Sequence, residues 1–203
     1  MPVSGKEWVK EFPTSDSVDD LEPDFRDKVK AFIAALTDAK AKISISATLR
    51  PRQRAYLMHY CWTINKKIDD PASVPAFKPT SGEHEIDIQW LHKKPDGAPD
   101  VAASRTAAAE MVAAYGMTRL KVAPALGSNH IFGKALDMSV GWTKTLSIRR
   151  KGGETGKAGK SVDITSSPRD STNADLIKVA KTYGVIHLID VEKDPPHWSF
   201  NGR

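Results

Sequence analysis

The sequence predicts an α+β fold, a single domain with a small antiparallel sheet flanked by helices. Helical periodicity dominates the first half of the chain, and short segments of strand character dominate the second half. No internal repeat or linker divides the chain, and 203 residues suffice for one domain with a sizeable core. We expect residues 1–22 to form an N-terminal arm and residues 23–203 to form the domain, with the proline-rich residues 69–100 as an insertion in it.

Four helices are expected from apolar spacing and end signals. Proline is favoured in a first helical turn, which suits Pro23 and Pro51, and Gly116 and Gly184 offer left-handed stops. Capping-box spacing marks the start of the last helix, from Thr172 to Asp175. The expected helices cover Pro23–Lys42, Pro51–Ile68, Val101–Tyr115 and a segment that starts near Thr172.

The expected strands are short and would form the sheet. Residues Ile43–Leu49 alternate apolar and polar side chains, as a half-buried strand does. The remaining expected strands are Leu120–Ala123, Ala135–Val140, Thr145–Arg149, Val185–Val191 and His197–Phe200.

Charge and cysteine content narrow the classes of function. The net charge of +5 favours polyanionic partners, either nucleic acid or an anionic bacterial envelope. The densest basic run, Arg149–Lys160, is rich in glycine and has no aromatic residue for base stacking, so we expect a solvated loop and no nucleic-acid partner. Cys61 is the only cysteine, expected to be a buried structural thiol, so any metal must be held by histidine and carboxylate.

The chain carries no signal for the membrane or for export. No stretch approaches the roughly 20 apolar residues that span a bilayer, so no membrane insertion is expected. The first residues lack a basic segment followed by an apolar run, so no signal peptide is expected.

Two short segments carry the residues that could bind a metal ion or catalyse a reaction. The first, SNHIFGKALD, places His130 and Asp137 seven residues apart around Gly133, and the second, DPPHW, places Asp194 three residues before His197. Two imidazoles and a carboxylate with one open position form a catalytic zinc site, and a second carboxylate can serve as its general base. We therefore expect His130, Asp137 and His197 to bind zinc, one ion per chain, and Asp194 to act as base. Spacing alone leaves open that these are unrelated polar residues at loop ends.

The first segment matches the pattern S-x-H-x-x-G-x-A-x-D of the D-alanyl-D-alanine carboxypeptidase family of zinc metallopeptidases. Residues 194–198 resemble the closing motif of that family, a carboxylate three residues before the last zinc histidine. The family includes VanX- and VanY-type enzymes and phage L-alanyl-D-glutamate endopeptidases, and its fold includes Hedgehog-type domains. The resemblance implies a peptidase that acts on the stem peptides of bacterial peptidoglycan.

The resemblance also implies an arginine that stabilises the oxyanion at the end of an early strand, which Arg50 matches. Arg52 and Arg54 stand close enough in sequence to compete for that assignment. The family's glutamine usually follows about five residues after the arginine, whereas Gln53 follows after three. Substrate contacts are implied at three positions, Ser128, Gln53 and Trp198.

An aspartate base in D-x-P-H resembles the L-alanyl-D-glutamate endopeptidase branch, so that bond is the expected one. A D-alanyl-D-alanine carboxypeptidase or D,D-endopeptidase is the alternative, and a non-catalytic, zinc-containing Hedgehog-like binding domain is a third. A wall hydrolase without a signal peptide implies release into the periplasm or cell wall. A holin or a secretion system would provide the route, with an immunity protein as a further expected partner.

Overall fold

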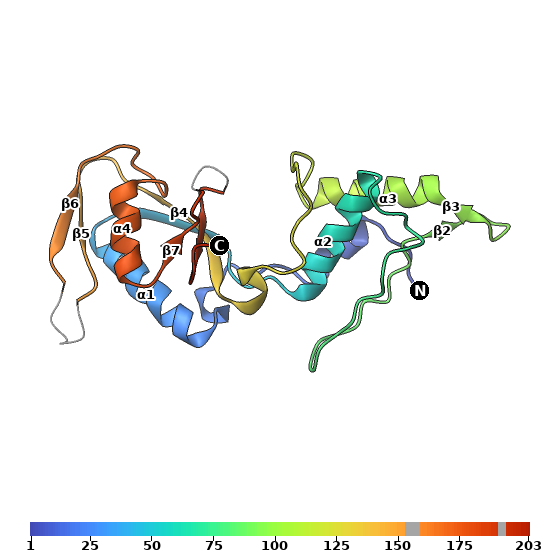
Figure 1. Cartoon of the computed structure of the whole chain (residues 1–203), viewed down its shortest axis with the longest axis horizontal. Helices are drawn as coiled ribbons and strands as arrows, with labels where there is room; N and C mark the ends of the chain where they lie inside the picture. The colour runs from blue at the N-terminus through green and yellow to red at the C-terminus, as the bar shows by residue number, and fades with distance from the viewer. Residues whose placement is uncertain (153–158, 191–193) are drawn as a thin grey trace. The chain divides into compact units, whose positions relative to one another are not determined.

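The computed structural model describes residues 1–152, 159–190 and 194–203 (Figure 1). Four α-helices and small antiparallel sheets make up the regular structure of these residues, so the predicted α+β class is confirmed. The chain divides into two compact units. Unit 1 comprises residues 1–13 and 51–128, and unit 2 comprises residues 14–50 and 129–203.

This division does not coincide with the expected boundary at residue 22. The first 13 residues belong to unit 1, because Val3 bridges to Gln89 and Ser4 Oγ bonds His92 Nε2 at 2.9 Å. The proline-rich segment expected as an insertion, residues 69–100, is also part of unit 1. Residues 51–128 of that unit interrupt unit 2 between Arg50 and Asn129.

Unit 1 is built on two helices of 14 residues each. Their facing apolar side chains form a core with Ile86, Ile88 and Trp90, and Cys61 is wholly buried in that core, as predicted. The elements of this unit are η1 (Lys6–Lys10), α2 (Arg52–Asn65), β2 (His92–Lys93), β3 (Pro99–Asp100) and α3 (Val101–Ala114).

Unit 2 contains the larger sheet, a separate hairpin and two helices. The strands are β1 (Lys42–Ala47), β4 (Ala135–Gly141), β5 (Leu146–Arg149), β6 (Ser161–Ile164), β7 (Ile186–His187) and β8 (His197–Ser199). The helical elements are η2 (Val18–Asp20), α1 (Pro23–Asp38), η3 (Asn129–Phe132) and α4 (Ala174–Thr182).

The larger sheet is antiparallel, with strand order β1-β4-β8-β7. Strand β4 lies in the middle, where Asp137 pairs with Ala47 of β1 and with His197 of β8. Neighbouring side chains of a strand point to opposite faces, so Leu136 and Met138 face away from Asp137. Both are fully buried, and the face that they share is therefore the core face of the sheet.

The core of unit 2 lies between this face and helices α1 and α4, which stand together in Figure 1. Helix α1 contributes apolar residues at intervals of three or four, and they are among the most buried in the chain. The core residues contributed by the two helices are Phe25, Val29, Phe32, Leu36, Leu176, Val179 and Ala180.

Several local predictions need correction. Residues 120–123 form a bend and irregular structure rather than a strand, and β6 was not predicted. Of the strand expected at Val185–Val191, only Ile186–His187 is regular, and residue 191 lies outside the described residues. The loop expected within Arg149–Lys160 likewise includes residues 153–158, which are outside the described part.

The start of α4 also differs from the prediction, while its end agrees. Asn173 is the N-cap, because its side-chain oxygen accepts from the backbone N–H groups of Asp175 and Leu176. Thr172 instead bonds the carboxylate of Asp170. Gly184 follows the helix with φ +76°, the left-handed conformation expected of a stop signal.

Within the described residues, no helix combines the length and apolar character that crossing a bilayer requires.

Candidate metal centre

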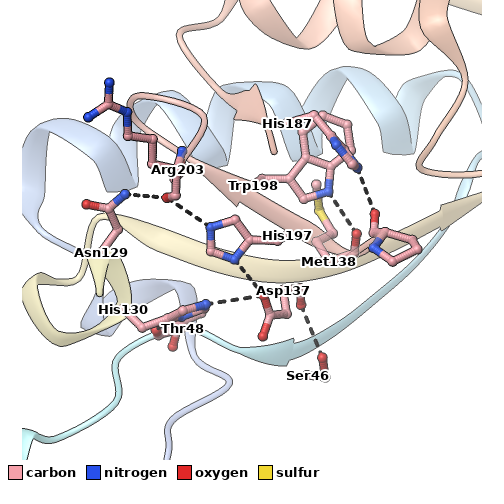
Figure 2. A network of polar contacts seen from close by, with 12 residues as sticks. Ser46, Thr48, Asn129, His130, Asp137, Met138, His187, His197, Trp198 and Arg203 are labelled. Carbon is pink, nitrogen blue, oxygen red and sulfur yellow. Dashed lines mark hydrogen bonds and ion pairs between the residues drawn. The ribbon is translucent and has the colours of Figure 1, made fainter. Parts of the chain in front are cut away.

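Three predicted ligands converge in unit 2, and the register of the sheet explains two of them. Asp137 and His197 are directly opposite each other on β4 and β8, so their side chains stand on the same face. His130 comes from η3, just before β4. Figure 2 shows the three side chains pointing toward one another.

A tight turn brings His130 back to the strand that carries Asp137. Gly133, between them, has φ +63°, a conformation that side chains with a Cβ rarely adopt. A Cβ at this position would also lie 2.8 Å from the backbone nitrogen of Glu22. The predicted need for glycine is therefore confirmed, for both conformational and steric reasons.

The potential ligand atoms form a small triangle. Oδ1 of Asp137 lies 3.2 Å from Nε2 of His130 and 3.2 Å from Nδ1 of His197. All three atoms lie within 4.8 Å of one another, and both histidines are buried. This is the only such group of histidine, cysteine and acidic residues in the described parts of the chain, and it could bind a metal ion.

Main-chain oxygens fix the far side of each imidazole. Nδ1 of His130 lies 2.7 Å from the carbonyl oxygen of Thr48, and Nε2 of His197 lies 3.2 Å from the main-chain oxygen of Arg203 (Figure 2). Such an oxygen can only accept, so these two nitrogens carry the hydrogens. In the neutral imidazoles, the nitrogens that face Asp137 are then left with their lone pairs, as metal ligation requires.

Asp137 and His197 shift each other's pKa values. Burial acts to raise the pKa of Asp137, but the two adjacent imidazoles, of His130 and His197, outweigh it and hold that pKa well below its usual range. Burial likewise acts to lower the pKa of His197, and the nearby Asp137 reverses this and raises it. Asp137 is thus an anion at neutral pH, ready to bind a cation.

Asp194 is the second carboxylate of the site. Its residue is exposed to solvent, yet partial burial of the carboxyl and the negative charge of Asp137 raise its pKa. Its backbone oxygen accepts the N–H of His197 at 3.0 Å, so the closing motif folds as a turn that keeps the acid beside the ligand. A raised pKa suits a group that must both take and release a proton near neutrality.

Arg50 belongs to the same unit and acts on the same carboxylate. Its backbone N–H donates to the carbonyl oxygen of His130 at 3.1 Å. Its positive charge acts against the net rise in the pKa of Asp194, as the smallest contribution to that pKa, and the guanidinium is therefore within electrostatic range of the acid. The competing arginines are engaged within unit 1, where Arg52 pairs with Glu83 and Arg54 donates to the carbonyl oxygen of Val9 at 3.1 Å.

Burial argues against two of the three expected substrate contacts, Trp198 and Gln53. Trp198 is completely buried, and its Nε1 donates to Met138 O at 2.9 Å. It follows His197 directly on β8 and so points to the core face. The amide of Gln53, 5% exposed, donates to the backbone oxygen of His84 at 3.1 Å within unit 1. Ser128 ends unit 1, its Oγ has no hydrogen-bond partner among the described residues, and its role in binding stays a prediction.

Sequence reasoning missed the groups that surround the ligands. Thr48 and Arg203 contribute only main-chain oxygens, which carry no side-chain signal. Asn129 occupies a variable position of the first motif, and its amide donates to the same Arg203 oxygen. His187 is 2% exposed and bonds the carbonyl oxygen of Pro195 at 2.7 Å.

Neither His59 nor His92 belongs to the group of potential ligands found among the described residues. His59 bonds the carbonyl oxygen of Pro124 at 2.8 Å, and His92 bonds Ser4, both within unit 1. No profile of a known protein family matches the chain, and a search of curated proteins finds none with significant sequence similarity. The resemblance to the metallopeptidases therefore depends on the two motifs alone.

Proposed function

We propose that this chain is a zinc-dependent peptidase that hydrolyses the stem peptides of bacterial peptidoglycan, as an L-alanyl-D-glutamate endopeptidase. One observation carries the proposal. Two motifs far apart in sequence bring His130, Asp137 and His197 together, with both imidazoles oriented by main-chain oxygens and a further carboxylate beside them.

The donor set suits zinc in chemistry and in spacing. Zinc takes imidazole and carboxylate ligands, and catalytic zinc sites use three protein ligands and keep one position open. In a tetrahedral site with bonds of about 2.0–2.1 Å, neighbouring ligand atoms stand about 3.3 Å apart. The two separations of 3.2 Å around Asp137 Oδ1 agree with that value.

When bound, zinc supplies the Lewis acidity that makes water a competent nucleophile near neutral pH and polarises a carbonyl oxygen. Asp194 accepts the proton of the attacking water, and its raised pKa supports this role. The same carboxyl then returns the proton to the departing amine nitrogen, so that each turnover leaves Asp194 unchanged.

Arg50 provides a fixed positive charge for the oxygen that becomes anionic as water attacks. A cation that is already in place stabilises this developing charge without reorganisation. The backbone bond between Arg50 and His130 and the influence of Arg50 on the pKa of Asp194 support this assignment.

A digest of purified peptidoglycan tests the cleaved bond. An L-alanyl-D-glutamate endopeptidase generates new N-terminal glutamate and leaves L-alanine on the glycan strands, and mass spectrometry of the products identifies both. Release of free D-alanine alone would instead identify a carboxypeptidase that uses the same centre. Asp194→Asn provides the inactive control, because it removes the base and keeps the shape of the side chain.

The zinc assignment has its own test. Elemental analysis of protein purified without added metal should find about one zinc per chain. Full activity in protein freed of metal by chelation would overturn the proposal. Bound zinc without any new amino groups from wall or stem peptides would favour the Hedgehog-like binding domain.

A further inference from the structure

The outer side of His197 is held by a second layer of contacts. Nε2 of His197 lies 3.2 Å from the main-chain oxygen of Arg203, which accepts and cannot donate. The hydrogen of this imidazole is therefore on Nε2, and the Nδ1 lone pair faces Asp137. Rotation or a change of tautomer would cost His197 this bond.

The Arg203 oxygen is itself fixed by a side chain from the other motif. Nδ2 of Asn129 donates to this oxygen (Figure 2). It also donates to Oδ1 of Asn201, at 2.8 Å. The backbone N–H of Arg203 bonds Oγ of Ser199 and Oδ1 of Asn201, each at 3.1 Å. Residues 199–203 thus form a tight turn that Asn129 ties back toward β8.

We propose that Asn129 is a positioning residue of the metal centre. Its amide holds the Arg203 oxygen in place, and that oxygen fixes the orientation and tautomer of His197. Asn129 directly precedes the ligand His130, so one segment supplies one ligand and orients another. The inference uses the metal centre of the proposed function but does not depend on the reaction that the centre catalyses.

Matched variants can distinguish the role of Asn129 from that of Asn201, its hydrogen-bond partner. In Asn129→Asp, the side chain keeps its shape but loses both donated hydrogens, and its carboxylate faces two oxygens. In Asn201→Asp, the Oδ1 acceptor that bonds Asn129 and Arg203 is retained. Both variants add the same negative charge at one contact, between Asn129 and Asn201, so a difference between them reports the lost donor.

The experiment measures the zinc affinity of the full chain by competition with a chromophoric chelator at fixed pH. Loss of a contact that orients a metal ligand typically weakens metal binding about 10- to 100-fold. We expect Asn129→Asp to lose affinity within that range, and Asn201→Asp to stay within about threefold of the native protein. Asn129→Ala removes the donor without adding charge and should also weaken binding, which covers the case that Asn129→Asp fails to fold.

Three outcomes would overturn the proposal. Native affinity in both Asn129 variants would show that His197 needs no such support. Equal loss in Asn129→Asp and Asn201→Asp would show that added charge, and not the donor, sets the affinity. Absence of zinc binding by the native chain would remove the metal centre and with it the proposed function, whereas the first two results leave that function intact.

Discussion

The imidazole of His187 donates its Nε2 hydrogen to the carbonyl oxygen of Pro195 at 2.7 Å. His187 is buried on β7 and meets Trp198 edge to face, with ring centroids 4.5 Å apart. The next carbonyl oxygen, of Pro196, accepts the backbone N–H of Met138 at 2.7 Å. Both prolines between Asp194 and His197 are therefore fixed by the sheet, and the position of the proposed base depends on them.

His187→Phe should slow peptide hydrolysis without removing zinc. Phenylalanine keeps a ring against Trp198 but cannot donate to Pro195 O, so Asp194 is less well placed. A misplacement of about 1 Å can cost about 100-fold in rate. We expect kcat to fall more than KM changes, measured by steady-state kinetics on a stem-peptide substrate.

His187→Gln is the matched variant, because its side-chain amide can donate to the same carbonyl oxygen. It should recover most of the rate that His187→Phe loses. If both variants lose the same activity, packing rather than the hydrogen bond sets the position of the base.

Asp194→Asn should keep the metal and lose turnover, by about 100-fold or more, as removal of a general base does. The amide resembles the carboxylate in size but cannot accept the proton of water. Zinc content and the rate of stem-peptide cleavage are measured on the same preparation. Asp190→Asn, at an exposed carboxylate before the same turn, is the control and should leave the rate unchanged. Loss of zinc from Asp194→Asn would instead make Asp194 a ligand.

Removal of the metal should lower the thermal stability of unit 2. A ligand present at about 100 times its Kd stabilises the folded state by about 2.7 kcal/mol. For a chain of this size the unfolding midpoint should fall by about 5–10 °C in excess chelator. Asp137→Ala should unfold at the same temperature with and without chelator, because its ligand triangle is incomplete. An equal drop in both proteins would mean that the chelator acts elsewhere.

Cys61 should be inert in the folded protein. Its thiol is fully buried in the core of unit 1, and that burial raises its pKa well above the ordinary value. A thiol reagent at pH 8 should therefore react only after denaturant is added, with one thiol per chain detected. Fast reaction under native conditions would show that the core around α2 opens locally.

The sequence was most informative where one local motif fixes both geometry and chemistry. In SNHIFGKALD, the histidine, the glycine turn and the strand aspartate lie within one short segment, and the turn brings the two potential ligands together as expected. The helices followed from apolar spacing in the same way. The distance between Asp137 and His197 was not predictable from spacing, because it is set by the register between β4 and β8.

Predictions failed where the outcome depends on distant partners. The family resemblance implied a substrate contact at Trp198, yet alternation along a strand turns this residue to the face opposite His197. Gln53 donates to the backbone oxygen of residue 84, and no local sequence pattern predicts this hydrogen bond. The joining of residues 1–13 with residues 51–128 is likewise a matter of long-range packing.

The interruption of unit 2 by residues 51–128 has a consequence for how the chain is made. The bond from His130 to Thr48 spans 82 positions, and β1 pairs with β4 over still longer separations. Such non-local contacts form slowly, since a long loop must close first. During synthesis, β1 emerges from the ribosome long before its neighbour β4, whereas all residues of unit 1 are available once residue 128 has emerged. Strand β8, with His197, follows later still, so the nascent chain cannot assemble the three-ligand centre before its last strand has been translated.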